Sequence, residues 1–271
     1  MKAIRNTAVI NGLKQRIKGK PDYIADHRPL PALPANAWPR VLVATLPKAG
    51  TYLISNMLAF MGFHQTYFHL GRNKMQAYDP CMLQEGVDAP RQFDARIPMR
   101  ESCHLIRSGE FAASHFAPDA DVTTFFRDFH VISCIRELRA MMVSYANFIC
   151  AAGPHRMPDN TQTLEQGLPH YIRECGPTYL RDAEAIYQWR NHANALMLRM
   201  EDIFESPFEN YKAIADHLGI SIEQQAFDWD HIKNMNSMTK NTDKKLFEWS
   251  DAAEEAFEEI SGPQTNERLG Y

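Results

Sequence analysis

The sequence lacks the features of a membrane-spanning or disulfide-stabilised protein. No apolar run reaches the roughly 18 residues that a transmembrane helix needs. The 271 residues include five cysteines, and no two of them have the C-x-x-C spacing. An odd number of dispersed cysteines is typical of structural thiols in a reducing compartment. We therefore expect a cytoplasmic protein with no integral membrane segment.

The N-terminus also lacks the continuous apolar core of a signal peptide. Residues 1–20 are basic and mildly amphipathic, which favours a peripheral arm, with a helix lying on a membrane surface as the alternative. Residues 27–39 are rich in proline and indicate an extended lead-in. We assign residues 1–39 to this arm and lead-in, and residues 40–271 to one folded domain.

There is no excess of positive charge. The formal net charge is −4, so no basic field points to nucleic acid or to an anionic membrane. Hydrophobic residues make up 45% and charged residues 23% of the chain, which is typical of a globular protein with a large core. An anionic ligand would need a local cluster of basic side chains. Neither H-E-x-x-H nor a paired-aspartate motif is present, so we expect no metal site.

Short apolar runs alternate with segments of helical periodicity. Residues 41–46 and 130–135 are apolar and rich in β-branched side chains, which is typical of buried parallel strands. A segment with helical spacing follows each run, the first ending at Gly62 and the second at Gly153-Pro154. This alternation predicts an α/β fold, a single domain with a mostly parallel central sheet and helices on both faces.

The C-terminal third continues the pattern. Residues 195–200 are a third strand candidate. The next helix is expected to begin at Ser206, which has the spacing of a capping box with Glu209, and to end at Gly219. A last, acidic helix is expected over residues 250–261.

The loop after the first strand reads Pro-Lys-Ala-Gly-Thr-Tyr. A strand-to-helix loop at the carboxyl end of a parallel sheet offers free backbone N–H groups and the positive end of a helix to a phosphate. Lys48 adds a charge, Gly50 allows close approach, and Thr51 and Tyr52 add hydroxyl groups. The lysine precedes the glycine, so G-x-x-x-x-G-K-[ST] is not matched. An ordinary turn with a surface lysine is the alternative.

A second basic position follows the second strand. Arg136 comes directly after residues 130–135, and Ser144 lies about two helical turns further on. A guanidinium fork and a hydroxyl together suit one phosphate. The alternative is a surface arginine with a serine that packs between helices.

The ordered set of "LPKAGTYL", "CIRELRAMMVSYANF" and "LMLRMEDIFESPFENYKAIADHLGI" resembles the sulfotransferases that use 3′-phosphoadenosine 5′-phosphosulfate (PAPS). The resemblance covers about residues 40–220. It implies a P-loop-like phosphosulfate-binding loop, PAPS as co-substrate, 3′-phosphoadenosine 5′-phosphate (PAP) as product, and no metal. The loop residues implied to hold the 5′-phosphosulfate are Lys48, Ala49, Gly50, Thr51 and Tyr52. Arg136 and Ser144 are implied to hold the 3′-phosphate.

The same resemblance implies a catalytic histidine at a strand end before the arginine strand. The segment "AASHFAPD" matches and gives His115. His115 is implied to take the proton of an acceptor hydroxyl or amine, while Lys48 stabilises charge on the leaving phosphate. The competing candidate is His104, in "ESCHLIR", a segment that we expect to be a core strand.

The sequence departs from the family at three places. Leu53 stands where the family often has a tryptophan that packs on adenine, and Met200 stands where it commonly has a tyrosine. The C-terminal segment that closes over the 3′-phosphate is not legible. Lys240, Lys244 or Lys245 could replace it, of which we assign Lys240, and a solvated basic loop is the alternative.

The acceptor is left open among small molecules, saccharides and peptides. Residues 64–100 and 151–178 are expected to wall its site with a mixture of apolar and basic side chains: Tyr67, Phe68, Met75, Tyr78, Met82, Phe93, Tyr171, His64, His69, Arg72, Arg91 and Arg96. A homodimer is also left open. Two other functions compete with sulfotransfer. A nucleotide-dependent phosphotransferase would need Mg²⁺ and an aspartate at a strand end, and the other alternative is a catalytically inactive PAP-binding protein.

Overall fold

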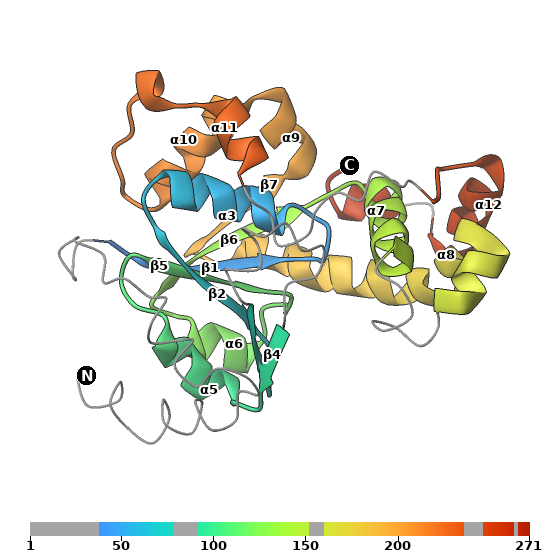
Figure 1. The fold of residues 1–271 in the computed structure, drawn as a ribbon, viewed down its shortest axis with the longest axis horizontal. Coiled ribbons are helices and arrows are strands. Elements are labelled where there is room, and N and C mark those ends of the chain that lie inside the picture. Colours follow the sequence, from blue (N-terminus) through green and yellow to red (C-terminus); the bar gives the residue numbers. More distant parts are fainter. Residues whose placement is uncertain (1–37, 79–91, 152–159, 236–245, 263–264) are drawn as a thin grey trace.

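The computed structural model describes residues 38–78, 92–151, 160–235, 246–262 and 265–271. They contain a seven-stranded sheet in the order β4-β3-β2-β5-β1-β6-β7 (Figure 1). The strands are β1 Arg40–Thr45, β2 His64–Leu70, β3 Met75–Tyr78, β4 Gln92–Ala95, β5 Glu110–Ser114, β6 Phe129–Ile135 and β7 Ala195–Arg199.

The central part of the sheet is parallel, as predicted. β1 pairs with β5 on one side and β6 on the other, and β2 and β7 extend the sheet in the same direction. In the described sheet the antiparallel pairs are β2 with β3 and β3 with β4, at one edge. The carboxyl ends of β1, β5 and β6 therefore lie side by side in the middle of the sheet.

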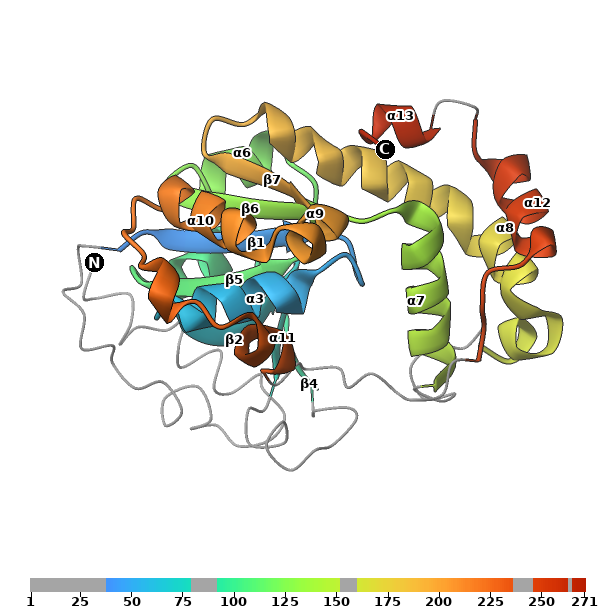
Figure 2. The same cartoon turned by 90° about the horizontal axis from the view of Figure 1, so that it is seen from above.

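Helices cover both faces of the sheet (Figures 1 and 2). On the face of α3 Thr51–Phe60 lie α9 Met200–Glu205, α10 Pro207–His217 and α11 Trp229–Asn234, and on the other lie α5 Met99–Ser102, α6 Ala120–Phe125 and part of α8 Asn160–Tyr187. Two hydrophobic cores result. Val41 and Val43 belong to the core under α3, whereas Leu42 and Ala44 belong to the core on the other face. Strand residues alternate between faces, which explains why β1 is apolar throughout.

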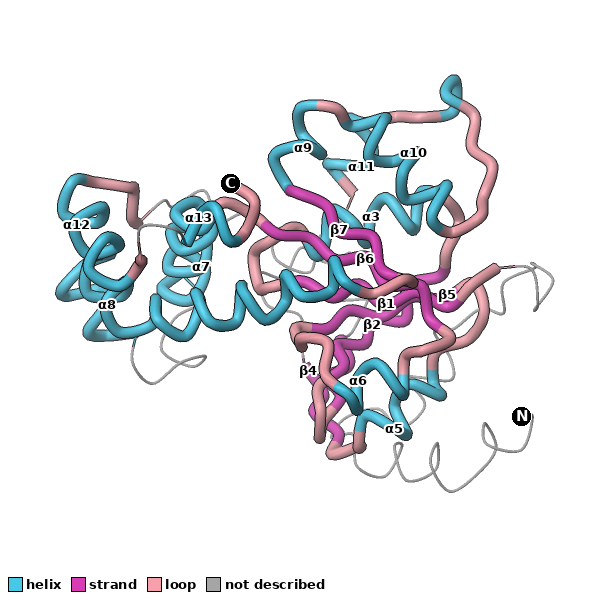
Figure 3. The backbone as a smooth tube through the Cα atoms, turned by 180° about the vertical axis from the view of Figure 1, so that it is seen from behind, coloured by secondary structure: helices cyan, strands magenta, loops and turns pink. Residues whose placement is uncertain are grey.

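A helical extension projects beside the sheet (Figure 3). α8 runs out from the sheet and packs against α7 Leu138–Ala151 and α12 Asp251–Ile260. The short remaining elements are η2 Cys103–Leu105, η3 Gln188–Asn191, η4 Gln224–Ala226 and α13 Thr265–Arg268. No helix in the described part of the chain combines the length and the apolar character needed to cross a membrane.

Two predicted helix ends are confirmed, and one predicted helix cap is wrong. Gly62 and Gly219 follow α3 and α10 with φ of 103° and 69°, a left-handed conformation that favours glycine at helix ends. Ser206 is the N-cap residue of α10, but its side chain makes no capping hydrogen bond, so the predicted capping box is wrong. Gly153-Pro154 lies outside the described residues.

The segment "ESCHLIR" is not a strand. It forms the end of α5 and the 3-10 helix η2. Met99, Ser102 and Cys103 are buried, whereas Arg100 and His104 are exposed. Buried positions spaced three and four residues apart belong to a helix, and a short apolar run alone does not separate a strand from a buried helix.

Candidate active site

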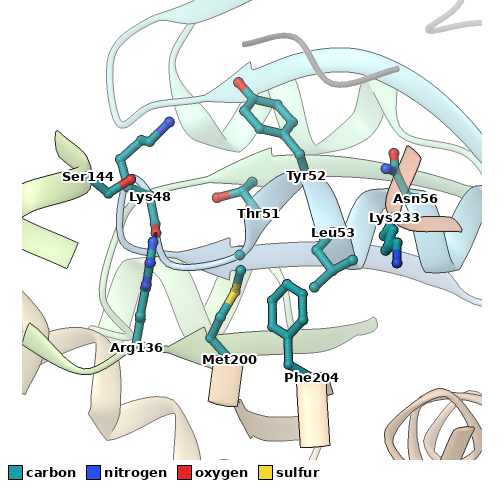
Figure 4. Close-up of a pocket in the computed structure, with 11 residues that line it drawn as sticks. Lys48, Thr51, Tyr52, Leu53, Asn56, Arg136, Ser144, Met200, Phe204 and Lys233 are labelled. Carbon is teal, nitrogen blue, oxygen red and sulfur yellow. Dashed lines mark hydrogen bonds between the residues drawn. The ribbon is translucent and has the colours of Figure 1, made fainter. Parts of the chain in front are cut away.

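A pocket lies where the loops after β1, β6 and β7 meet (Figure 4). Eleven residues from the β1–α3 loop, α3, the end of β6, α7, α9 and α11 line it: Lys48, Gly50, Thr51, Tyr52, Leu53, Asn56, Arg136, Ser144, Met200, Phe204 and Lys233. The structure thus brings the two predicted basic motifs into one cavity at the carboxyl edge of the parallel sheet.

The β1–α3 loop has the geometry of an anion cradle. Gly50 is the N-cap of α3 with φ of 98°, and no side chain caps this helix end among the described residues. The first N–H groups of a helix have no intrahelical partner and carry partial positive charge. A Cβ atom at Gly50 would lie 2.7 Å from the Met200 Sδ and 3.3 Å from the Cys134 Sγ. Only glycine fits, because any side chain would be both strained and crowded.

Hydrogen bonds fix the start of α3. Ile54 N donates to the Gly50 carbonyl at 3.0 Å, and the buried Thr51 and Thr45 hydroxyls hydrogen-bond to each other. Ser55 Oγ donates to the Thr51 carbonyl at 2.8 Å. The loop residue Ala49 is fully buried and belongs to the hydrophobic core, so it anchors the loop to the sheet.

Two of the basic residues that line the pocket, Lys48 and Arg136, are in contact. Arg136 Nη1 donates to the Lys48 carbonyl at 3.2 Å, and Lys48 Nζ lies 4.7 Å from the centroid of the Phe148 ring. Desolvation, and then the charge of Arg136, lower the pKa of Lys48 from its ordinary value. Two like charges in a partly desolvated site repel each other, and a bound anion would relieve that repulsion.

A carboxylate network fixes the backbone that follows Arg136. Glu137 N donates to Glu201 Oε1 at 3.0 Å, and the Tyr271 hydroxyl donates to Glu201 Oε2 at 2.9 Å. Glu137 Oε2 accepts from Ala140 N at 2.9 Å at the start of α7. The Glu137 and Glu201 carboxylates thus accept from backbone N–H groups and from the Tyr271 hydroxyl. The Arg136 guanidinium donates to the Lys48 carbonyl instead and lines the pocket.

Arg139 lies outside this pocket. Its guanidinium donates to both carboxylate oxygens of Glu254, at 2.8 and 2.6 Å. These bonds raise the pKa of Arg139, and they lower the pKa of Glu254. The guanidinium also stacks on the Phe257 ring at 4.3 Å. Arg139 therefore ties α7 to α12.

His115 directly follows β5 and lies beside the end of β1, where the β1–α3 loop begins. It is not among the residues that line the pocket. Its Nδ1 lies 2.7 Å from the Thr45 carbonyl oxygen. A carbonyl only accepts, so Nδ1 carries the hydrogen and Nε2 carries the lone pair. The β1–β5 register pairs Ala44 with Ser114, which places the residues after them side by side.

The surroundings of His115 keep it neutral. Desolvation lowers the pKa of His115, and the hydrogen bond with Thr45 opposes this shift in part. Part of the residue is exposed to solvent, so an acceptor can reach it. The lowered pKa leaves the ring uncharged near neutral pH. The His69 ring packs against it edge to face with centroids 5.1 Å apart, and burial lowers the pKa of His69 to about 3.

Three pocket residues were missed by the sequence analysis. Asn56 lies one helical turn after Tyr52, and Phe204 lies one turn after Met200, so helical spacing carried a signal for both. Lys233, on α11, carried none. Lys240, Lys244 and Lys245 lie outside the described residues.

The predicted acceptor walls are only partly accessible. Met75 and Tyr171 belong to the core, with exposures of 0% and 1%, so the expectation that they line a site is wrong. Met75 packs into this core from β3, and Tyr171 packs into it from α8. The side chains of Tyr78, Met82, Arg91 and Phe93 lie outside the described residues.

Other members of that predicted wall lie near the histidine. Tyr67, Phe68 and His69 line a small cavity together with Tyr52. Arg72 is exposed and forms an ion pair with Asp119. In the described ranges no group of three or more His, Cys, Asp or Glu side chains could hold a metal ion.

Fold and site define an α/β protein whose central strand–helix loop has the geometry of an anion cradle and lies beside a neutral histidine. The model of the sulfotransferase domain family matches residues 38–259, and the chain belongs to this family. Comparison with curated protein sequences found no match.

Two solved structures illustrate the likeness. A mouse sulfotransferase, SULT7A1, complexed with PAP is 14% identical, with a TM-score of 0.46 over 88% of this chain and 83% of the other. A retinol dehydratase in a complex with retinol and PAP is 16% identical, with a TM-score of 0.43 over 87% of this chain and 82% of the other. Both are distant, so family membership rests on the match to the family model.

Proposed function

We propose that the protein transfers a sulfuryl group from PAPS to a hydroxyl or an amine of a small-molecule, saccharide or peptide acceptor. The observation that carries this proposal is that Lys48 and the Arg136–Ser144 pair line one pocket. A donor with separate 5′ and 3′ anionic groups needs two such positions. The loop bends through Gly50 in a left-handed conformation and α3 begins there, which fits a phosphosulfate that lies against the backbone N–H groups.

Each half of the pocket has a proposed role. Residues 48–52 hold the 5′-phosphosulfate with the N–H groups of α3, the Lys48 ammonium and the hydroxyl of Tyr52. Arg136 and Ser144 hold the 3′-phosphate from the neighbouring strand end. Lys240 closing over the 3′-phosphate stays a prediction.

His115 acts as the general base. Its Nε2 takes the acceptor proton while the acceptor oxygen or nitrogen forms a bond to sulfur. The bond between sulfur and the phosphate oxygen breaks, and Lys48 stabilises the charge that develops on that oxygen. PAP leaves with this electron pair. The Thr45 carbonyl keeps the ring in the tautomer that the step needs.

The competing functions have less support. Family membership favours sulfuryl over phosphoryl transfer, and none of the described residues that line the pocket is an aspartate or glutamate, the ligands that a Mg²⁺-dependent phosphotransferase uses. An inactive PAP-binding protein would have no need of a histidine held in the basic tautomer next to the loop.

The acceptor would lie beside His115. The Tyr52, His69 and His115 rings form a row beside α3, with centroids 6.4 Å apart for Tyr52 and His69 and 5.1 Å apart for His69 and His115, which supports an acceptor position on this side of the histidine. A cytoplasmic location and a homodimer stay predictions from the sequence.

Transfer of label from PAPS tests the function and its base together. Wild-type protein with labelled PAPS and a library of hydroxyl and amine acceptors should give a sulfated product by mass spectrometry. His115→Ala should lower its turnover by about two to four orders of magnitude and leave PAP affinity nearly unchanged. His104→Ala, on the exposed face of η2, is the matched control and should keep wild-type turnover. Transfer of the γ-phosphate of ATP, with no use of PAPS, would contradict the proposal.

A further inference from the structure

A buried histidine outside the nucleotide pocket contacts the proposed base. His69 on β2 is 7% exposed, and no other histidine in the described part of the chain is buried. Its ring packs edge to face on the His115 ring, with centroids 5.1 Å apart and an interplanar angle of 63°. Desolvation of an imidazole costs free energy that an apolar side chain at the same position would not cost. The place of His69 beside His115 therefore calls for a reason.

An irregularity of β2 brings His69 to this place. In the β2–β5 ladder Gln65 pairs with Phe111 and His69 pairs with Ala113, so four steps along β2 match two steps along β5. A regular ladder from Gln65 onward would put His69 level with His115, beyond the end of β5. The bulge instead holds His69 inside the sheet, behind His115. Bulges are frequent next to active sites, where they redirect a side chain.

The bulge strains the backbone. Tyr67, which lies within it, has φ of 57°, a left-handed conformation that side chains other than glycine rarely adopt. Among the described residues only one other non-glycine residue has a positive φ, and it is Lys48 of the β1–α3 loop, at 66°. Backbone strain is retained mainly at sites where it serves a function. The two strained positions are the proposed phosphosulfate loop and the segment that carries His69.

Two contacts together fix the His115 ring. Nδ1 donates to the Thr45 carbonyl at 2.7 Å, but one hydrogen bond alone leaves the ring able to turn about the axis of that bond. The His69 ring packs across the His115 ring and removes this freedom. Because His69 is buried and His115 is exposed, the contact lies on the protein side and leaves the outer side for an acceptor. Burial lowers the pKa of His69 to about 3, so His69 adds no charge beside the base.

We propose that His69 is a positioning residue for His115, whose ring, placed by the bulge of β2, fixes the direction in which His115 Nε2 meets the acceptor. The ring of His69 serves this role, and its nitrogen atoms take no part in the proton transfer. The inference rests on the proposed function, because that function makes His115 the base.

Two variants separate the ring of His69 from its nitrogen atoms. His69→Gln keeps a polar side chain without a ring, and it should lower kcat by up to about a hundredfold, as expected for a displaced catalytic group. His69→Phe keeps an aromatic ring and should keep wild-type kcat. PAP affinity, measured by calorimetry, should be unchanged in both variants, because His69 does not line the nucleotide pocket. His69→Leu, which also has no ring, makes the same comparison if His69→Gln does not fold.

The matched control is a second pair of histidines. His130 on β6 packs edge to face on His217 of α10, with centroids 5.0 Å apart and an interplanar angle of 72°. His130 lies near the amino end of its strand, and neither histidine lines the pocket. His130→Gln removes a ring from a pair of similar geometry and should leave kcat at the wild-type level.

Nitrogen-15 NMR of histidine-labelled protein reports on His115 without an acceptor. The His115 signals are assigned by their loss in His115→Ala. Wild type should carry the hydrogen on Nδ1 and show a pKa below the ordinary 6.5. In His69→Gln, water that enters beside the ring should raise this pKa, and the two neutral tautomers should mix, whereas His69→Phe should resemble wild type. Tyr52 and Tyr67, the titratable neighbours that line a small cavity with His69, are the same in every variant.

The outcomes distinguish this inference from the proposed function. Wild type that neither binds PAP nor transfers a sulfuryl group would overturn the function. Wild-type transfer, with the kcat and the His115 signals of His69→Gln unchanged, would overturn the positioning role alone. The reverse order, in which His69→Gln resembles wild type and His69→Phe does not, would show that a nitrogen atom of His69 is required and would also overturn it.

Discussion

Thr45 links the histidine to the anion-binding loop through its two oxygen atoms. Its carbonyl accepts from His115 Nδ1, and its hydroxyl hydrogen-bonds to Thr51 at the start of α3. The strand end thus sets the position of the proposed base and of the proposed phosphosulfate site together. Pre-positioned groups are what lower the barrier in a transfer reaction that has little covalent chemistry for the protein to do.

The pH dependence should report the protonation of His115. A base must be neutral, and desolvation lowers the pKa of His115 below the ordinary 6.5. kcat/KM should therefore be level around neutral pH and fall by about tenfold per pH unit once the pH drops below that lowered pKa. A pH–rate profile measures this, with PAP affinity titrated over the same range as the control. A rate that increases on acidification through pH 6.5 would contradict the neutral-base assignment.

Arg136 should discriminate between nucleotides with and without a 3′-phosphate. Removing a charge-assisted contact costs about 1.5 to 3 kcal/mol, so Arg136→Ala should weaken PAP by about ten- to a hundredfold. Adenosine 5′-phosphate has no 3′-phosphate, so its affinity should fall far less. The small remaining loss would come from the β1–α3 loop, because the Lys48 carbonyl loses its hydrogen bond from Arg136. Ser144→Ala should show the same selectivity with a smaller loss.

Paired calorimetric titrations of PAP and adenosine 5′-phosphate measure both effects. Equal losses for the two nucleotides would show that Arg136 acts through the β1–α3 loop, and would contradict its assignment to the 3′-phosphate.

The elements that carry the site differ in how far the sequence predicts them. β1 and β6 are predictable because a strand buried on both faces is a continuous apolar run. The contact between His115 and Thr45 follows only from the register that pairs Ala44 with Ser114, which no local pattern encodes. The contact between His69 and His115 is likewise a tertiary property, because it depends on the bulge that shifts β2 against β5.

The contact between α7 and α12 should contribute to stability without affecting the pocket. Arg139 forms a two-pronged ion pair with Glu254, and Trp249 Nε1 donates to the same carboxylate at 2.8 Å. The side chains are 30% and 35% exposed, so solvent screens part of the interaction. Arg139→Ala should lower the free energy of unfolding by about 1 to 2 kcal/mol, as measured by urea denaturation.

The control for this prediction is a second ion pair that also reaches α12. Arg173 on α8 pairs with Glu259, and both side chains are more exposed, at 43% and 54%. Arg173→Ala should cost less stability than Arg139→Ala, and neither variant should change PAP affinity. A loss of PAP affinity in Arg139→Ala would show that Arg139 belongs to the site after all.

At the scale of the whole molecule, the charge of the pocket is opposite in sign to the net charge of the chain. The chain carries a net charge of −4, yet its central pocket is lined by three basic side chains, Lys48, Arg136 and Lys233. The residues that line this pocket come from the loop after β1, the end of β6 and the helices α3, α7, α9 and α11. A ligand that contacts the β1–α3 loop, the β6–α7 connection and α9 at once therefore binds only when the sheet is intact.

Ligand binding should accordingly stabilise the entire fold. PAP at about 100 times its dissociation constant should raise the free energy of unfolding by roughly 2.7 kcal/mol, and for a domain of this size each kcal/mol raises Tm by about 2 to 4 °C. ATP with Mg²⁺ should stabilise the protein much less, because it has no 3′-phosphate for Arg136 and Ser144. Thermal unfolding of wild type and Arg136→Ala with each nucleotide measures the difference, and the variant should lose most of the PAP effect. Equal stabilisation of wild type by ATP with Mg²⁺ and by PAP would favour the phosphotransferase alternative over the proposed sulfotransferase.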